Sequence, residues 1–266
     1  MRPEPALFRR NDATETTRRR LAGMNPDPIA IARRLLNRAE KELVERIIAA
    51  GSSAAAAAAG EIRGYFLSAL QEFMTTLGKL PHATANWILD LDRGWHARRL
   101  THVETQLVQE AWGSRINPAD VRIVKGAGLS AWAAIAFRKG NPAITLGNTI
   151  YIKSDLKYLT HSDLSNSLRG IEMLLHEYTH VVQYATLGFA RFGTRYASEL
   201  KAHGYDPDKL YDYGSRNNDW FHETLEGQAQ IVGEFGSAKR ALNVPKNRTL
   251  ADRLRAKLKG TGIYAQ

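Results

Sequence analysis

The sequence predicts a mostly helical α+β protein with a small β-sheet in front of its most distinctive helix. Three observations support this fold class. Apolar residues recur at helical spacing through most of residues 27–116, and again through residues 171–183 and 219–237. Short runs rich in β-branched residues stand between these helical parts, at residues 121–124 and 143–153. We therefore expect helices, then a small sheet, then helices again.

The composition predicts a soluble globular protein. With 266 residues, of which 44% are hydrophobic, the chain is long enough to bury a sizeable core. No apolar run approaches the ~18 residues of a membrane span, and the basic N-terminus lacks the apolar segment of a secretory signal. The absence of cysteine excludes disulfides and thiolate metal ligands. We expect synthesis in the cytoplasm, with export by a dedicated secretion or injection machine left open.

The first part of the chain is predicted to be helical. A basic, flexible N-terminal segment, residues 1–26, precedes a helical region that extends over residues 27–116. Glycine and serine at positions 51–53 interrupt this region, and the alanine run that follows favours a new helix start. Three helical stretches are expected there, at residues 29–48, 54–77 and 83–111.

The pattern changes after Pro118. Residues 121–124 are predicted to form one strand, and residues 143–153 two strands joined at Gly147-Asn148 by a tight two-residue turn. Such a sheet could offer an edge strand that pairs with the extended backbone of a peptide. The alternative is an ordinary sheet whose edge is capped by loops.

The third helical part carries an H-E-x-x-H motif made by His176, Glu177 and His180. On a helix, residues four apart lie on one face, so the two imidazoles are able to bind one metal ion. Glu177 is placed to act on a water at that metal rather than to bind it. This division of roles is typical of zinc peptidases, in which the metal lowers the pKa of its water and the carboxylate takes the proton.

A third protein ligand is expected from the helix predicted at residues 219–237. Asp219 is its expected N-cap and Gly236 its expected end. We predict Glu226 as the ligand, because small residues around it would let another helix approach closely. Glu223 is the first alternative, and His222 the second, since imidazole is an equally good zinc donor.

His222 is also the first candidate for a second catalytic role. If it does not bind metal, it could donate a hydrogen bond to the oxyanion that develops during hydrolysis. Tyr184, Tyr196 and Tyr205 are the alternatives for this role. The intervening residues 191–218, which are rich in Tyr, Gly and Asp, are predicted to form a wall or lid of the cleft.

These residues together resemble the zincin-like domain of extracellular contractile injection system clusters and bacterial toxin polyproteins, of gluzincin type. The family signature is a V-R-I strand, an A-x-T-x-G-N-x-I-Y hairpin and H-E-x-x-H-x-x-Q. The matching residues are Val121, Arg122, Ile123, Ala143, Thr145, Gly147, Asn148, Ile150, Tyr151, His176, Glu177, His180 and Gln183. The resemblance implies a zincin-like metallopeptidase fold over residues 117–237 and a metal site at His176, His180 and Glu226.

The chain departs from this family at two positions. Members usually continue with an E-x-E-A-D-like helix, and Glu226, Gln228, Ala229 and Gln230 occupy those places. Where the family offers a carboxylate to orient a metal-bound histidine, Gln230 offers an amide. An amide oxygen accepts the same hydrogen bond more weakly.

Positive charge is concentrated at the two ends of the chain. Residues 121–235 are balanced, with 12 basic and 12 acidic groups, whereas residues 236–266 carry 8 and 1. This basic C-terminal tail, residues 238–266, and the arginines at positions 9, 10 and 18–20 could meet an acidic partner. No aromatic residues alternate with the basic ones of the tail before Tyr264, which argues against stacking on nucleic acid.

The sequence therefore predicts a zinc-dependent peptidase that acts on a protein or peptide. His176, His180 and Glu226 are expected to hold Zn²⁺, with Glu177 as general base. Two other functions stay open. One is a non-catalytic zinc-containing component of a bacterial toxin or injection system, and the other is a nucleic-acid-binding helical protein.

Overall fold

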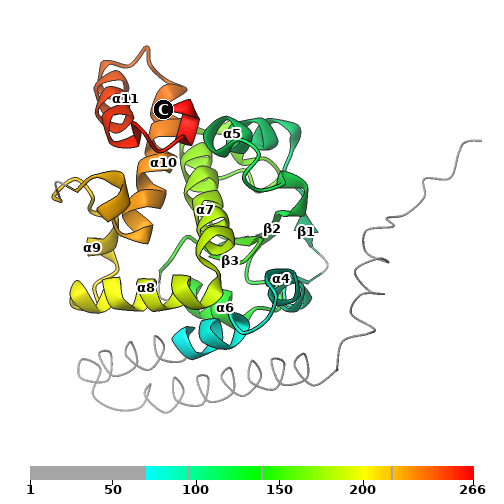
Figure 1. Ribbon diagram of the computed structural model, residues 1–266. Coiled ribbons are helices and arrows are strands. Elements are labelled where there is room, and N and C mark those ends of the chain that lie inside the picture. Colours follow the sequence, from blue (N-terminus) through cyan, green and yellow to red (C-terminus); the bar gives the residue numbers. More distant parts are fainter. Residues whose placement is uncertain (1–69, 95, 139, 217) are drawn as a thin grey trace, which may run out of the picture.

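The structure, a computed structural model, describes residues 70–94, 96–138, 140–216 and 218–266. These residues are mostly helical with one small sheet, which confirms the predicted fold class. Two long helices, α7 (Leu168–Leu187) and α10 (Leu225–Lys239), pack against each other in the interior (Figure 1). The predicted helix at residues 29–48 lies outside the described residues. Of the stretch predicted at 54–77, residues 70–77 are described and are helical.

The other elements surround this central pair. The other labelled α-helices are α4 (His82–Leu91), α5 (His102–Trp112), α6 (Ala131–Arg138), α8 (Phe189–Ala202), α9 (Asp208–Tyr211) and α11 (Pro245–Leu258). The strands are β1 (Ala97–Arg98), β2 (Arg122–Lys125), β3 (Ala143–Leu146) and β4 (Thr149–Ile152). Short 3-10 helices are η1 (Pro118–Asp120), η2 (Leu164–Asn166), η3 (Trp220–His222) and η4 (Ile263–Ala265).

The four strands form one mixed sheet in the order β1-β2-β4-β3. The strand predicted at residues 121–124 and the hairpin predicted at 143–153 are both present, with the turn at Gly147-Asn148. Gly147 has a φ of 57°, a left-handed conformation that glycine adopts readily at such a turn. Among the described strands, β3 pairs with β4 alone and is therefore an edge strand, a position that the sequence left open.

The sheet separates two apolar clusters. Ile150 and Ile152 of β4 belong to the cluster that contains α7, α10 and α11, whereas Tyr151 belongs to the cluster that contains α4, α6 and α8. Successive side chains of a strand point to opposite faces, so this alternation fixes the register of β4. Both faces of the sheet are thus covered, and α7 lies directly against the sheet.

Helix α7 begins where Ser167 accepts a hydrogen bond from the backbone N–H of Gly170, and it ends at Gly188. It packs closely against α10 because Gly233 of α10 lacks a side chain. A Cβ at Gly233 would lie 2.5 Å from the carbonyl oxygen of Glu172 and 3.3 Å from the Cβ of His176. This contact confirms the predicted close approach of a helix at the small residues of α10.

The start and end of α10 differ from prediction. Asp219 does cap a helix, but it is the short η3, and Thr224 caps α10 by accepting from the N–H of Gly227. Gly236 does not end the helix. A Cβ there would meet Leu175 at 2.2 Å, so this glycine serves the packing of α10 on α7.

Other segments also differ from the sequence-based expectation. The helical stretch predicted at 83–111 is interrupted by β1, which pairs with β2. Helices α6 and α8 were not predicted as helices. The basic C-terminal segment contains α11, whose Ala251, Leu254 and Leu258 are buried in the core. The proposed domain boundaries stay a prediction.

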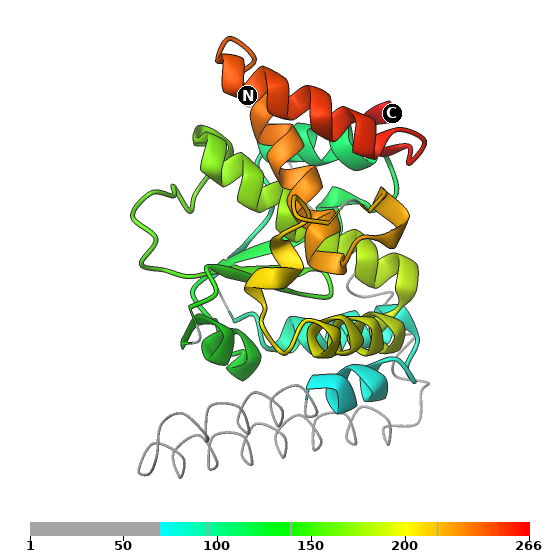
Figure 2. The ribbon, with the colours of Figure 1, turned by 90° about the vertical axis from the view of Figure 1, so that its left-hand side faces the viewer.

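The helical residues 70–77 lie beside α8 at the end of the molecule opposite α11 (Figure 2). The two segments approach at Gly193, where a Cβ would lie 2.6 Å from the Cβ of Met74. Phe192 and Met74 are buried at this contact. In the part of the chain that the structure describes, no helix has both the length and the apolar character of a membrane span.

Candidate metal centre

Three predicted ligands, His176, His180 and Glu226, come together in the interior. Each is at least 93% buried. The Nε2 atoms of the two histidines lie 3.2 Å apart, and each lies 3.1 Å from Oε2 of Glu226. Donor atoms around a tetrahedral zinc with bonds of 2.0–2.1 Å stand about 3.3 Å apart. The three side chains therefore already have the spacing of a metal site and could hold a metal ion.

The local structure explains how this cluster forms. His176 and His180 are one turn apart on α7, so their side chains point the same way. Glu226 is in the first turn of α10, where the helix dipole favours a negative charge. The close packing of α10 on α7 at Gly233 then holds the carboxylate over the two imidazoles.

The electrostatics of the cluster are dominated by the contact between Glu226 and His180. Burial alone lowers the pKa of His180, but the neighbouring Glu226 carboxylate outweighs it and raises the pKa to about 9. Burial favours the neutral form of Glu226, yet the two imidazoles hold its pKa well below its usual range. Glu226 is thus an ionised acceptor, ready to bind a cation.

Gln183 orients His180. The Nδ1 atom of His180 lies 2.8 Å from Oε1 of Gln183, whose Nε2 in turn donates to the carbonyl of Leu225 and to Oε1 of Gln228. The amide is therefore fixed with its oxygen towards the histidine. In the neutral ring this contact favours the proton on Nδ1, which would leave Nε2 as the metal ligand.

The prediction that Gln230 orients a metal-binding histidine is wrong. Its Nε2 donates to Glu172 at 3.2 Å and to Glu234 at 2.8 Å, on the outer side of the two helices. The amide of Gln183, one turn beyond the motif on α7, takes this role instead.

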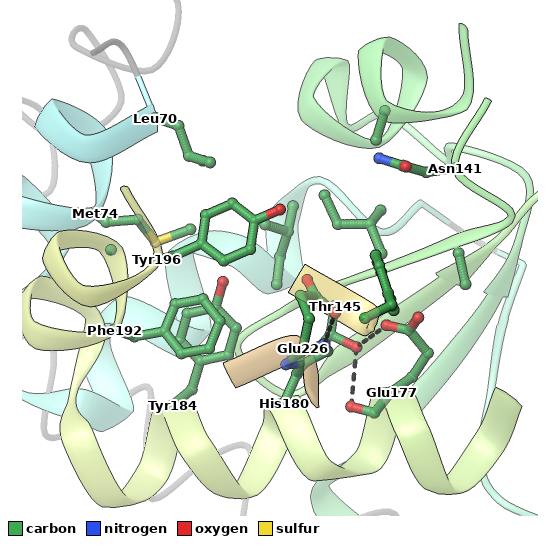
Figure 3. A pocket seen from close by; sticks show the side chains of 16 residues that line it. Leu70, Met74, Asn141, Thr145, Glu177, His180, Tyr184, Phe192, Tyr196 and Glu226 are labelled. Atoms are coloured by element: carbon green, nitrogen blue, oxygen red, sulfur yellow. Dashed lines mark hydrogen bonds and ion pairs between the residues drawn. The ribbon is translucent and has the colours of Figure 1, made fainter. Parts of the chain in front are cut away.

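Glu177 lies beside the cluster but does not join it. Its Oε2 accepts a hydrogen bond of 2.8 Å from the hydroxyl of Thr145 on strand β3, and the same hydroxyl lies 3.1 Å from the backbone carbonyl of Glu177 (Figure 3). Burial raises the pKa of Glu177, against the lowering influence of the two histidines and of Thr145. A buried carboxylate with a raised pKa is suited to accept and return a proton.

Tyr211 is the residue that sequence reasoning missed. Its ring stacks on His176 with centroids 5.5 Å apart and an interplanar angle of 19°, and its side chain hydrogen-bonds to Glu226. Burial raises its pKa well above the usual value, so the hydroxyl stays protonated as a donor. No spacing pattern marked it, because it belongs to the four-residue helix α9 in a stretch without periodicity.

The other tyrosine candidates divide into two groups. Tyr184 and Tyr196 line the same cavity as His180 and Glu226 (Figure 3). Tyr205 is 40% exposed and has a φ of 60°, at the turn after α8. The structure therefore does not bring Tyr205 to the cluster.

The two alternative ligands lie elsewhere. The side chain of His222 is 78% exposed, and its Nδ1 lies 2.8 Å from Oδ1 of Asp219. Glu223 is buried, but its carboxylate pairs with Arg216 at 2.8 Å. Neither residue belongs to the cluster that could hold a metal, so the structure does not support a metal-binding or oxyanion role for His222.

Two cavities are lined in part by residues of the cluster. The first, here called the inner cavity, has a volume of about 90 Å³ and includes Glu177, His180 and Glu226 in its wall. The second, here called the outer cleft, has about 690 Å³ and reaches His176 and Glu177. Residues 191–218 contribute to the walls of both, since Phe192 and Tyr196 line the inner cavity and Tyr211 lines both. This confirms the wall predicted for that segment.

The site is therefore a buried group of two histidines and one glutamate, with a second glutamate beside it and two cavities in contact with it. No protein-family model, curated protein or solved structure matches the chain.

Proposed function

We propose that this protein is a zinc-dependent peptidase. The observation that carries the proposal is the division of roles among four buried side chains. His176, His180 and Glu226 converge on one point, whereas Glu177 stays out of this group and lines both cavities. Three ligands with a carboxylate held nearby are what metal-assisted hydrolysis requires.

The donor set fits zinc. Two imidazole nitrogens and one carboxylate oxygen form a common catalytic zinc ligand set, which leaves the fourth position for water or substrate. Bound there, Zn²⁺ would lower the pKa of a water molecule and polarise the substrate carbonyl. The orienting contact of Gln183 with His180 is the kind of support that metal-bound histidines have in proteins.

Glu177 acts as the general base in this proposal. It takes a proton from the water whose oxygen attacks the carbonyl carbon, and it passes that proton to the nitrogen as the C–N bond breaks. Thr145 holds the carboxylate in place through the hydrogen bond to Oε2. The hydroxyl of Tyr211 is the proposed donor to the oxyanion, because it remains protonated and contacts Glu226 while its ring stacks on His176.

Strand β3 is the proposed site for the substrate backbone. The backbone N–H of Lys153, which follows β4, donates to the carbonyl of Pro142. Backbone groups alternate along an antiparallel strand, so Ile144 and Leu146 also direct theirs towards β4. The backbone groups of Ala143 and Thr145 then point to the open edge. This edge lines the inner cavity, where a peptide would add as a further strand.

A zincin-like fold is part of the same proposal. It is supported by the order of the elements: a small mixed sheet with edge strand β3, then the helix that carries both histidines, then the helix that carries Glu226. Helix α7 contacts β3 directly, through Thr145 and Glu177.

The test is proteolysis by the full chain after zinc loading. Incubation with a peptide mixture, followed by mass spectrometry, should show cleavage that a chelator abolishes and added zinc restores. The Glu177→Gln variant should bind zinc like the wild type but lose at least about 100-fold in rate, because it lacks the general base. If the wild type binds zinc and cleaves nothing, or if Glu177→Gln cleaves equally fast, the protein is not a peptidase of this kind.

A further inference from the structure

The outer cleft is strongly acidic although the chain as a whole is basic. The formal net charge of the protein is +10. Among the described residues that line the cleft, apart from Glu177, five carry carboxylates and one, Arg169, carries a guanidinium. The five are Glu172, Asp206, Asp208, Asp212 and Glu234. The sign of this cleft is therefore opposite to that of the protein and is not a consequence of composition.

Among the described residues, ion pairs reach two of these five carboxylates, and Arg216 acts on Asp212 only through a weaker electrostatic influence. Arg169 pairs with Glu172, and Lys209 reaches Asp206 only at 3.9 Å with both side chains exposed. Glu234 is contacted by neutral groups, the hydroxyl of Tyr213 and the amide of Gln230. A cleft lined by one sign of charge attracts ligands of the other sign. The outer cleft thus fits lysine or arginine side chains.

The inner cavity has the opposite character. The rest of its wall is made mainly of apolar side chains from four elements, among them Ala136 and Ile144. Leu70, Met74 and Phe192 belong to the same wall (Figure 3). A water needs ~10–15 Å³ of such space, so about 90 Å³ corresponds to roughly six waters. This is room for one apolar side chain and not for a large ligand.

The two cavities meet at the proposed general base. Asn141, Glu177 and Tyr211 line both of them. A peptide bond held at Glu177 therefore has the inner cavity on one side and the outer cleft on the other.

The direction of the peptide follows from β3. Residues 140–142, before the strand, line the outer cleft, whereas Ala143 to Leu146 line the inner cavity. Antiparallel pairing is the more stable arrangement per residue. An antiparallel peptide has its N-terminal part beside Leu146 and its C-terminal part beside residues 140–142.

We propose that the substrate is a peptide with an apolar residue before the cleaved bond and basic residues after it. This rests on the proposed peptidase function and adds a substrate class to it. The apolar side chain fills the inner cavity, and the basic side chains lie along the outer cleft.

Four matched peptides test this specificity with the zinc-loaded full chain. The first has leucine followed by two arginines within a Gly/Ser frame. In the others, glutamates replace the arginines, serine replaces the leucine, or the order is reversed. The first peptide should have the highest kcat/KM, about 10-fold or more above each of the others. Its advantage over the glutamate peptide should shrink with added salt. Equal rates for all four, or faster cleavage of the reversed peptide, would overturn the proposal.

Variants test which cavity produces the preference for basic residues and which produces the preference for an apolar residue. Asp206→Asn combined with Asp208→Asn removes two charges and keeps the acceptor that Asp206 offers to the N–H of Asp208. It should reduce the preference for arginine over glutamate severalfold. The matched control, Asp155→Asn with Asp252→Asn, changes the net charge equally at two exposed sites outside the cleft and should leave the preference unchanged. An equal effect of both pairs would refute a role for the cleft.

The inner cavity is tested by Ala136→Ile, which should narrow it and reduce the preference for leucine over serine. Ala134→Ile, on the same helix but outside the lining, is the control. Thermal unfolding shows whether each variant is folded. If Ala136→Ile does not fold, the comparison of the leucine and serine peptides with the wild-type protein tests the preference for an apolar residue.

A binding measurement separates the specificity from the catalysis. Zinc-loaded Glu177→Gln should bind the four peptides in the order given for cleavage, as measured by fluorescence anisotropy. If binding follows that order and the wild type cleaves none, peptidase activity is refuted and the binding specificity holds. If the wild type cleaves without preference, the specificity is refuted and peptidase activity holds.

Discussion

The hydroxyl of Thr145 donates a 2.8 Å hydrogen bond to the carboxylate of Glu177. This contact joins the edge strand of the sheet to the helix that carries the two histidines of the candidate metal centre. It also ties the proposed base to the strand that we expect to hold the substrate. The proposed base is thus held by the same hairpin whose edge we expect to bind the substrate.

Thr145→Val should reduce kcat about 10- to 100-fold while zinc content is unchanged, because the carboxylate is no longer held in place. In the wild type this hydrogen bond favours the charged form of Glu177. Without it, the pKa of Glu177 should rise further above the usual value. The acidic limb of the pH profile of kcat/KM should therefore move to higher pH.

The Thr145→Ser variant keeps the hydroxyl and should restore most of the rate and the position of the acidic limb. If Thr145→Val and Thr145→Ser have the same profile as the wild type, Thr145 does not position the base.

Gln183→Leu should weaken zinc binding about 10- to 100-fold, because His180 loses the acceptor that fixes its ring. Gln230→Leu is the matched control, since Gln230 contacts Glu172 and Glu234 and not the histidines. Competition with a chromophoric chelator measures both affinities. Equal losses in the two variants would contradict the distinct roles of these glutamines.

Tyr211→Phe should lower kcat about 10- to 100-fold and leave zinc content intact, because the ring still stacks on His176 while the donor to the oxyanion is gone. His222→Ala should have wild-type activity, since this exposed side chain lies outside the site. Steady-state kinetics with one peptide compares the two variants, and a defect in His222→Ala with normal Tyr211→Phe would reverse the assignment.

Zinc binding should release protons near neutral pH. In the metal-free protein the pKa of His180 is about 9, above its ordinary 6.5, so this ring is charged at pH 7. Its contact with Glu226 stabilises the metal-free fold fully below pH 6.5, and this contribution disappears as the pH rises through 9. Zinc requires the neutral imidazole, so apparent affinity should rise with pH over the same interval. Calorimetry in buffers with different ionisation enthalpies counts the protons, and a count of zero at pH 7 would contradict a charged His180.

The sequence was sufficient for the parts of the site that depend on local spacing. His176, Glu177 and His180 follow from a five-residue motif on one helix, and Glu226 from the periodicity of the next helix. The hairpin was equally accessible, because Gly147-Asn148 separates two runs of β-branched residues.

Features that depend on tertiary contact were missed or misplaced. Strand β1 has two residues, too few for a periodic pattern, and exists through its pairing with β2. Asp219 and Thr224 are both good N-caps, and the sequence does not say which one begins the long helix. Gly236 resembles a helix end, but its role is to admit Leu175.

At the site, the contacts of Tyr211 and Gln183 also depend on tertiary structure that the sequence does not reveal. The stacking of Tyr211 on His176 joins two segments 35 residues apart, with no regular structure to predict the distance. The H-E-x-x-H-x-x-Q motif contains Gln183, but the motif does not indicate that its amide contacts His180. The choice between Gln183 and Gln230 depends on which side of α10 faces α7.

The most direct test of the central claim is the zinc content of Glu226→Ala after dialysis, measured by mass spectrometry beside the wild type and Glu223→Ala. Glu223 is a matched control, because it is a buried carboxylate three residues away that pairs with Arg216. The proposed metal centre predicts one zinc per chain in the wild type and in folded Glu223→Ala, and loss of zinc in Glu226→Ala. Full zinc content in Glu226→Ala, with loss in Glu223→Ala, would contradict it.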